Sequence, residues 1–263
     1  MKLFRRNMLQ VMVTGAVCAG VPSLIWAAPQ TIAPEYDVIV IGSGFAGLAA
    51  AISAAENGAK VAVLEKMQVA GGNSSRSGGM MAIPGSSVQK EQGIEDSPAK
   101  LAADMKRIGL GLGDPDHIKV VTELAAPTFE WTKKQGVVWR TDLTGKGGHS
   151  ARRCLITKEG TGQGILIPFM AKLKELGVPV FTGVKVISLD KNKDGRVIGV
   201  TARQGYKFGK EDSGKTVEIK AKDGVILAFG GFSADIAYRT LLDPKLTANL
   251  KTTNQPGATA ELM

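Results

Sequence analysis

The sequence predicts an α/β fold, namely a dinucleotide-binding (Rossmann-like) parallel sheet with an added antiparallel β layer. The first observation is a β-branched run at residues 36–41 that leads into the pattern Gly-x-Gly-x-x-Gly at 42–47. The second is a small-residue helix at 48–56 followed by an apolar strand at 60–64, which completes a βαβ unit. The third is a hairpin pattern within residues 184–221.

Each glycine of the first motif has its own expected role. Gly42 lets the chain turn out of the strand, Gly44 allows a pyrophosphate to approach the backbone, and Gly47 lets the helix pack on the sheet. Phosphates at this helix N-terminus are stabilised by free N–H groups and by the helix dipole. Glu65 follows Gly47 by 18 residues, where a carboxylate accepts ribose hydroxyls and disfavours a 2′-phosphate. The alternative is a glycine turn in an ordinary βαβ unit.

The remaining elements follow from spacing and turn signals. Residues 70–81 form a glycine-rich loop, which lies against a large flat ligand or is a flexible surface loop. Apolar spacing with start and stop signals predicts helices at residues 98–110, 116–135 and 165–176. Strands are expected at residues 136–140, 178–181, 184–189, 196–202, 215–221 and 224–232, and a polar loop at 142–163.

Residues 1–28 are predicted to be an export signal. A basic start precedes an apolar stretch that is too short and too glycine-broken for a good membrane span. Arg5 and Arg6 resemble a twin-arginine signal, and Ala27 and Ala28 indicate cleavage nearby. An ordinary secretory signal and an uncleaved anchor are the alternatives. We therefore expect a periplasmic protein with a linker at 29–35 and one domain at 36–263.

Composition excludes several functional classes. The 263 residues carry a net charge of +9, but the basic residues are scattered, so nucleic acid is a poor partner. Cys18 and Cys154 are the two cysteines of the whole sequence, and Cys18 lies in the predicted signal. The sequence therefore offers no disulfide within the mature chain, no c-type haem motif and no iron–sulfur cluster. A redox protein of this composition must receive its electrons from another molecule.

The order of several motifs resembles a known family. These motifs are residues 42–47, 65–66, 71–74, 78–79, 224–232 and 253–259. Their order is similar to that of the fumarate reductase and flavocytochrome c flavoproteins, which include exported soluble fumarate, methacrylate and urocanate reductases. The resemblance covers nearly everything after residue 34.

The resemblance implies a bound FAD and a set of cofactor-binding residues. Ala46 and the first glycines would meet the pyrophosphate, Glu65 would take the adenosine ribose, and the backbone of Val186 would meet the adenine. The flavin side would be lined by the loop at 72–79. The full implied set is Gly42, Gly44, Ala46, Gly47, Glu65, Lys66, Gly72, Asn73, Ser74, Gly78, Gly79, Val186, Ala228 and Gly230.

The FAD is expected to be noncovalent, because residues 74–77 lack the histidine through which membrane-bound relatives attach it. Phe229 departs from the threonine that relatives often carry there. The family continues into a capping domain that supplies the substrate clamp and an arginine proton donor. This chain reaches Met263 before that region, so we expect a fragment, a truncated product or half of a split protein, and no catalytic residue within it.

Few other residues are candidates for chemistry. His149 is either near the flavin or a surface histidine, and Arg152 and Arg153 either bind a carboxylate substrate or are structural. His117 is expected to be structural.

The resemblance implies reduction of the C=C bond of a small unsaturated carboxylic acid by hydride from reduced FAD, with electrons from a separate cytochrome or other donor. The alternatives are an incomplete FAD-binding module that needs a second polypeptide, and a FAD-dependent dehydrogenase of another substrate such as a ketosteroid. No stable membrane span is expected after signal cleavage.

Overall fold

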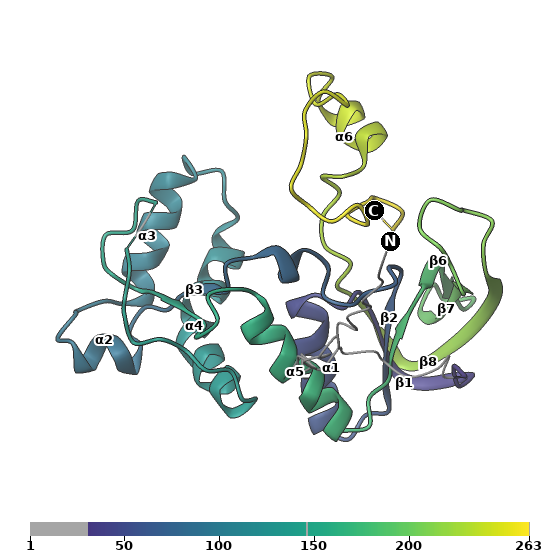
Figure 1. Cartoon of the computed structure of the whole chain (residues 1–263), viewed down its shortest axis with the longest axis horizontal. Helices are drawn as coiled ribbons and strands as arrows, with labels where there is room; N and C mark the ends of the chain where they lie inside the picture. The colour runs from purple at the N-terminus through teal and green to yellow at the C-terminus, as the bar shows by residue number, and fades with distance from the viewer. Residues whose placement is uncertain (1–30, 146, 263) are drawn as a thin grey trace, which may run out of the picture. The chain divides into compact units, whose positions relative to one another are not determined.

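The computed structural model describes residues 31–145 and 147–262. All described elements belong to one unit, residues 32–263, shown in Figure 1. In chain order they are β1 (Glu35–Ile41), α1 (Phe45–Glu56), β2 (Val61–Glu65), the 3₁₀ helix η1 (Gly72–Arg76), β3 (Met80–Ala82), α2 (Ser87–Glu91), α3 (Pro98–Ile108), α4 (Pro115–Lys134), β4 (Cys154–Ile156), α5 (Gln163–Glu175), β5 (Val180–Thr182), β6 (Val184–Lys191), β7 (Val197–Gln204), β8 (Lys215–Leu227) and α6 (Ile236–Leu242).

A parallel sheet forms the centre of the fold, in the order β5-β2-β1-β8. All five residues of β2 are buried, as expected for a parallel strand covered on both faces. The predicted βαβ unit is confirmed. Its helix begins at Phe45, inside the glycine motif, because Gly44 is already extended and acts as the N-cap residue.

The antiparallel strands β7 and β6 continue the same sheet beyond β8. The two strands predicted at residues 215–221 and 224–232 are one strand of 13 residues, which ends at Leu227, so residues 228–232 are not part of a strand. Its first half pairs antiparallel with β7, and its second half pairs parallel with β1. The strands β1 and β7 lie on opposite edges of β8, and the pairing of β8 with β1 has an irregularity between Tyr36 and Val38. The predicted hairpin between β6 and β7 is confirmed.

Three layers result. One core cluster joins Ile39 and Leu64 of the parallel strands to Val186, Val200 and other residues of the antiparallel strands. In Figure 1 the helices α1 and α5 lie on the opposite side of β1 and β2 from β6 and β7. The antiparallel layer and the helices therefore cover the two faces of the parallel strands.

A second cluster holds α2, α4 and the pair β3–β4 together, with Ile83, Phe129 and Leu155 at its centre. Here the sequence predictions need correction. The strand expected at 136–140 is a single bridge between Trp139 and Thr157. The loop expected at 142–163 contains β4, because Cys154 to Ile156 pair with β3 and become shielded from water.

The N-terminal predictions fall largely outside the described part of the chain, including the whole export signal at 1–28. Of the predicted linker, Ile32 and Ala33 pack on the core, and the Pro34 carbonyl accepts a hydrogen bond from the Lys220 amide. These residues therefore belong to the folded unit. Within the described residues, we find no helix with the length and apolar character that crossing a bilayer demands.

Candidate cofactor-binding groove

The glycine motif forms a tight turn between β1 and α1. Gly42 has a φ of +100°, and a Cβ there would lie 2.4 Å from the Ala228 carbonyl oxygen. A Cβ on Gly47 would lie 1.9 Å from the Gly42 carbonyl oxygen. Both positions therefore require glycine, the first for its backbone conformation and the second for the close approach of helix and turn.

The N-terminus of α1 opens toward a cavity. The amides of the first helical turn have no intrahelical acceptors, and Gly44 has no side chain to cap them. The Ser74 hydroxyl accepts from the Phe45 amide at 2.9 Å, although it lies 29 residues away. The remaining first-turn amides and the helix dipole suit an anion such as a pyrophosphate.

Glu65 ends β2 beside this helix and is 6% exposed. Its Oε2 accepts from the Ser43 hydroxyl at 2.5 Å and from the Ser43 amide at 3.2 Å. Its Oε1 accepts from the Met67 amide at 2.8 Å. These bonds hold the carboxylate in one orientation at the cavity wall, where it can accept a further hydrogen bond from a ligand.

The cavity brings together most of the predicted cofactor residues. Its lining consists of residues 41–46, 64–67, 72–74, 184–186, 228–230, 255, 257–259, 261 and 262. The predicted residues among them are Gly42, Gly44, Ala46, Glu65, Lys66, Gly72, Asn73, Ser74, Val186, Ala228 and Gly230. These positions come from five separate chain segments that meet at the carboxyl ends of the parallel strands, the usual ligand site in such sheets.

Three predicted residues lie outside this lining. Gly47 lies behind it, between α1 and the turn. A Cβ on Gly79 would lie 2.3 Å from the Thr161 carbonyl oxygen, and its neighbour Gly78 faces open space. Gly79 thus serves the packing of β3 against the segment before α5, and its predicted role at the flavin stays a prediction.

Sequence reasoning missed Ser43, Lys185 and the segment 255–262 as parts of the lining. Asn73 holds this segment, since its Oδ1 accepts from the Gln255 amide at 2.6 Å. The signal for Ser43 was its place inside the glycine motif. Residues 253–259 are one of the motifs that carry the family resemblance, but their spacing does not show that this segment returns to the end of β2.

Charged groups line the cavity beside Lys66. Lys66 bonds the Thr259 hydroxyl and forms a 3.0 Å ion pair with Glu261, and Lys185 lies 3.5 Å from the same carboxylate. Burial alone would raise the pKa of Glu261, but the hydrogen bonds from Thr259 and Lys66 outweigh it and hold the pKa at about 2. Segment 255–262 is therefore tied to β2 by an ion pair at neutral pH.

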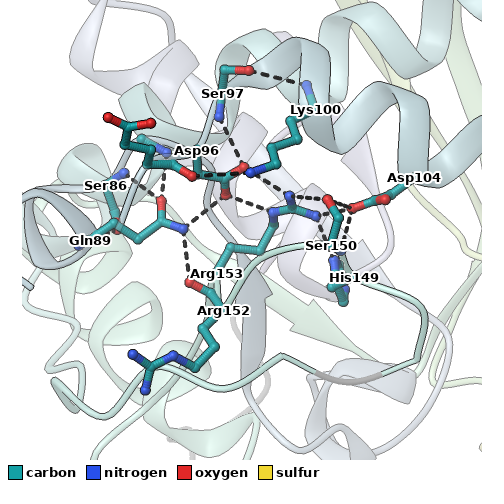
Figure 2. Close-up of polar contacts among 12 residues, drawn as sticks. Ser86, Gln89, Asp96, Ser97, Lys100, Asp104, His149, Ser150, Arg152 and Arg153 are labelled. Atoms are coloured by element: carbon teal, nitrogen blue, oxygen red, sulfur yellow. Dashed lines mark hydrogen bonds and ion pairs between the residues drawn. The ribbon is translucent and has the colours of Figure 1, made fainter. Parts of the chain in front are cut away.

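The other candidate site is a buried ionic cluster. Figure 2 shows Arg153 between Asp96 and Asp104, a group we call the Arg153 cluster together with His149, Ser150 and Gln89. The side chain of Arg153 is fully buried, donates to both oxygens of Asp96 at 2.7 and 2.8 Å, and contacts Asp104 at 2.6 Å.

The electrostatics match this geometry. The hydrogen bond from Arg153 holds the pKa of Asp104 well below its usual range. Burial works against ionisation of Asp96, but the bonds from Arg153 and Gln89 still lower its pKa. Both carboxylates are therefore charged at neutral pH and matched to the guanidinium.

This cluster settles the role of Arg153. All its donor groups face internal partners, with His149 Nδ1 at 3.0 Å, so Arg153 is structural and does not bind a carboxylate substrate. Arg152 is exposed, and its side chain points away from the cluster in Figure 2. His117 lies exposed in the first turn of α4, where Asp114 accepts from its backbone amide, and the structural role of its side chain stays a prediction.

Comparisons with known proteins agree with this groove. A family described as "FAD binding domain" matches residues 37–262. The acrylate reductase flavoprotein subunit of Shewanella woodyi is 43% identical over 230 residues, which are 87% of this chain and 46% of that protein.

Two solved structures share the fold. The open conformation of a flavocytochrome c3 fumarate reductase has a TM-score of 0.78 and 27% identity, covering 86% of this chain and 39% of the other. A 3-ketosteroid-Δ4-(5α)-dehydrogenase from Rhodococcus jostii has a TM-score of 0.75 and 26% identity, covering 86% and 52%.

The chain thus spans about half the length of these proteins or less. The glycine turn, the open N-terminus of α1 and the buried Glu65 fit the dinucleotide part of FAD, and the family match covers all of them. The chain belongs to the FAD-binding domain family of the fumarate and acrylate reductase-type flavoproteins, and its cofactor is FAD.

Proposed function

We propose that this chain is the cofactor-binding part of a reductase that saturates the C=C bond of a small unsaturated carboxylic acid. The observation that carries the proposal is the 43% identity to an acrylate reductase flavoprotein subunit over 87% of this chain, together with the FAD-binding family match over residues 37–262, which contain the whole groove. Acrylate and fumarate, the acids named in two of the similar proteins, both carry a C=C bond next to a carboxylate.

The residues of the groove bind and orient the cofactor. The amides at the start of α1 take the pyrophosphate, and Glu65 takes hydroxyls of the adenosine ribose. The Ser74 hydroxyl, which accepts from Phe45, still has its proton to donate to a phosphate oxygen. When bound, reduced FAD would supply a hydride for one alkene carbon, and a proton donor outside this chain would protonate the other carbon. Two electrons from a separate cytochrome or other donor, with one proton from solvent, would restore the reduced flavin.

In this proposal, the described residues supply neither the proton donor nor the residues that bind the substrate. Arg153 is committed to Asp96 and Asp104, and His149 contacts Arg153. We therefore propose that a further polypeptide segment, in the same protein or in a partner subunit, completes the active site.

The test combines flavin content with turnover. We expect the purified chain to carry close to one FAD and to oxidise reduced methyl viologen when acrylate, fumarate or urocanate is added together with the completing segment. A preparation that holds FAD but leaves all three acids unreduced would contradict the proposed reaction. A colourless preparation would contradict an autonomous cofactor domain.

The FAD is proposed to be noncovalent, because Ser74, Ser75, Arg76 and Ser77 offer no histidine for attachment. Heating the protein in detergent is expected to release all of the flavin into a low-molecular-weight filtrate. Yellow colour that remains with the denatured polypeptide would refute this proposal.

A second candidate function is the dehydrogenation of a ketosteroid. It is favoured by the TM-score of 0.75 to a 3-ketosteroid dehydrogenase solved with a steroid. Reduction of an artificial electron acceptor in the presence of 5α-androstane-3,17-dione, the saturated ketosteroid whose Δ4 dehydrogenation gives 4-androstene-3,17-dione, without activity toward unsaturated acids, would select this candidate.

We also propose export to the periplasm by the twin-arginine route, on the basis of Arg5 and Arg6. Replacing both with lysine is expected to retain the protein in the cytoplasm, as measured by cell fractionation. Unchanged periplasmic recovery would favour an ordinary secretory signal.

A further inference from the structure

Ser43 lies in the glycine turn and is completely buried. Its hydroxyl donates to Glu65 Oε2 at 2.5 Å and accepts from the Gly71 amide at 2.9 Å. A serine hydroxyl carries a single proton, so the donation to Glu65 uses its whole donor capacity. Ser43 thus joins three segments: the turn before α1, the end of β2 and the start of the loop that contains Asn73.

The bonds of Ser43 determine where the free capacity of Glu65 lies. An ionised carboxylate has about four lone-pair sites. The hydroxyl and amide of Ser43 both bond Oε2, whereas Oε1 receives the Met67 amide alone. The remaining acceptor capacity is therefore on Oε1, on a carboxylate that lines the cavity.

We infer that Ser43 is a positioning residue for the adenosine ribose of FAD. It turns the carboxylate of Glu65 so that Oε1 meets a ribose hydroxyl, and it holds the loop at residues 71–74 against the same carboxylate. The inference rests on the FAD site of the proposed function. It assigns ribose recognition to the Ser43–Glu65 pair and not to Glu65 alone.

The test uses two nucleotides that differ only in the ribose hydroxyls. Full-length protein freed of flavin is titrated calorimetrically with ADP and with 2′,3′-dideoxy-ADP. The wild type is expected to prefer ADP, and Ser43→Ala is expected to lower that preference by about tenfold, the usual worth of a hydrogen bond to a charged group. Ser53→Ala, which changes an exposed serine of α1, is the matched control and should keep the preference.

Two further measurements separate positioning from packing. In a Glu65→Gln background, Ser43→Ala should cost little additional ADP affinity, because the two residues act as one unit. The Gly71 amide should exchange with solvent faster in Ser43→Ala, because it loses its acceptor. Should Ser43→Ala fail to fold, Ser43→Cys, which keeps a weak donor of similar size, carries the same comparison.

The outcomes distinguish this inference from the proposed function. Equal losses of affinity for both nucleotides in Ser43→Ala, or an unchanged preference for ADP, would overturn the role of Ser43 and leave FAD binding intact. A wild type that binds FAD and prefers ADP but reduces no unsaturated acid would overturn the proposed reaction and leave the role of Ser43 intact.

Discussion

The cofactor groove and the Arg153 cluster both gather polar groups inside the fold, but they use them in opposite ways. In the groove, the first amides of α1 lack intrahelical partners and Glu65 keeps acceptor capacity at the cavity wall. In the cluster, one guanidinium meets two carboxylates, and the remaining donors and acceptors bond one another. The groove is arranged for a ligand, whereas the cluster is complete without one.

The difference shows why residue types alone mislead. The segment around His149 and Arg153 is glycine-rich and basic, which is typical of a site for an anionic substrate. Its charges are nevertheless satisfied by Asp96 and Asp104, which stand about 50 residues earlier in the chain. A binding site is therefore recognised by hydrogen-bond donors and acceptors that remain unused after folding, and such groups are found in the groove.

The largest effect is expected from a substitution that disrupts the Arg153 cluster. Arg153→Met removes the buried cation, which leaves Asp96 without an ion-pair partner and Asp104 with only the exposed Arg107, and this should lower the free energy of unfolding by about 3–5 kcal/mol. Urea denaturation of the flavin-free protein measures this. Arg152→Met, at the exposed neighbouring position, should have little effect. If the Arg153→Met variant were as stable as the wild type, the Arg153 cluster would not be a structural unit.

The next largest effect is expected from a substitution that disrupts the glycine turn between β1 and α1. Gly47→Ala places a methyl group where only 1.9 Å separates it from the Gly42 carbonyl oxygen, so α1 must shift. We expect a loss of about 1–3 kcal/mol in stability together with loss of FAD, measured by thermal unfolding and flavin fluorescence. Gly224→Ala, whose Cβ would meet nothing within 4 Å, is the control. Normal FAD affinity in Gly47→Ala would refute close packing at this position.

A change at the ribose acceptor sharpens the comparison, although it also removes the hydrogen bonds of Glu65 with Ser43 and Met67. Glu65→Ala should weaken FAD binding about 10- to 100-fold, because it removes the ribose acceptor with its charge. Fluorescence titration of flavin-free protein gives the dissociation constant. If the variant kept a full flavin complement under the same conditions, the ribose assignment of Glu65 would be wrong.

The smallest effect concerns the ion pair at the cavity. The pKa of Glu261 is about 2 in the folded protein, against about 4.3 in an unfolded chain. Its depressed value stabilises the fold above pH 4.3, and this contribution disappears as the pH falls toward 2. Glu261→Gln should therefore lower the unfolding temperature slightly at neutral pH, corresponding to about 0.2–1 kcal/mol, and not at pH 2. A pH-independent difference between the two proteins would exclude the ion pair as its cause.

Local signals account for the parts of the fold that were predicted correctly. The βαβ unit, α3, α4 and the β6–β7 hairpin each follow from apolar period, caps and turn residues that lie within a few positions of one another. The strand expected at 136–140 and the break expected between 221 and 224 were wrong. In both cases the pairing partners, and not the local sequence, decided the outcome: residues 136–140 form only one bridge, between Trp139 and Thr157, and β1 and β7 share one continuous β8.

The sequence by itself determined the dinucleotide-binding class, the glycine turn and the position of Glu65, because these depend on backbone conformation and on spacing within one βαβ unit. Only the tertiary structure decided that Ser43 orients Glu65, that residues 255–262 line the groove, and that Arg153 is structural. Those roles depend on contacts between segments far apart in the chain, such as Gln255 with Asn73 and Arg153 with Asp96. A hydrogen bond satisfied at such a distance leaves no periodic or local trace in the sequence, yet it decides whether a polar side chain remains available to a ligand.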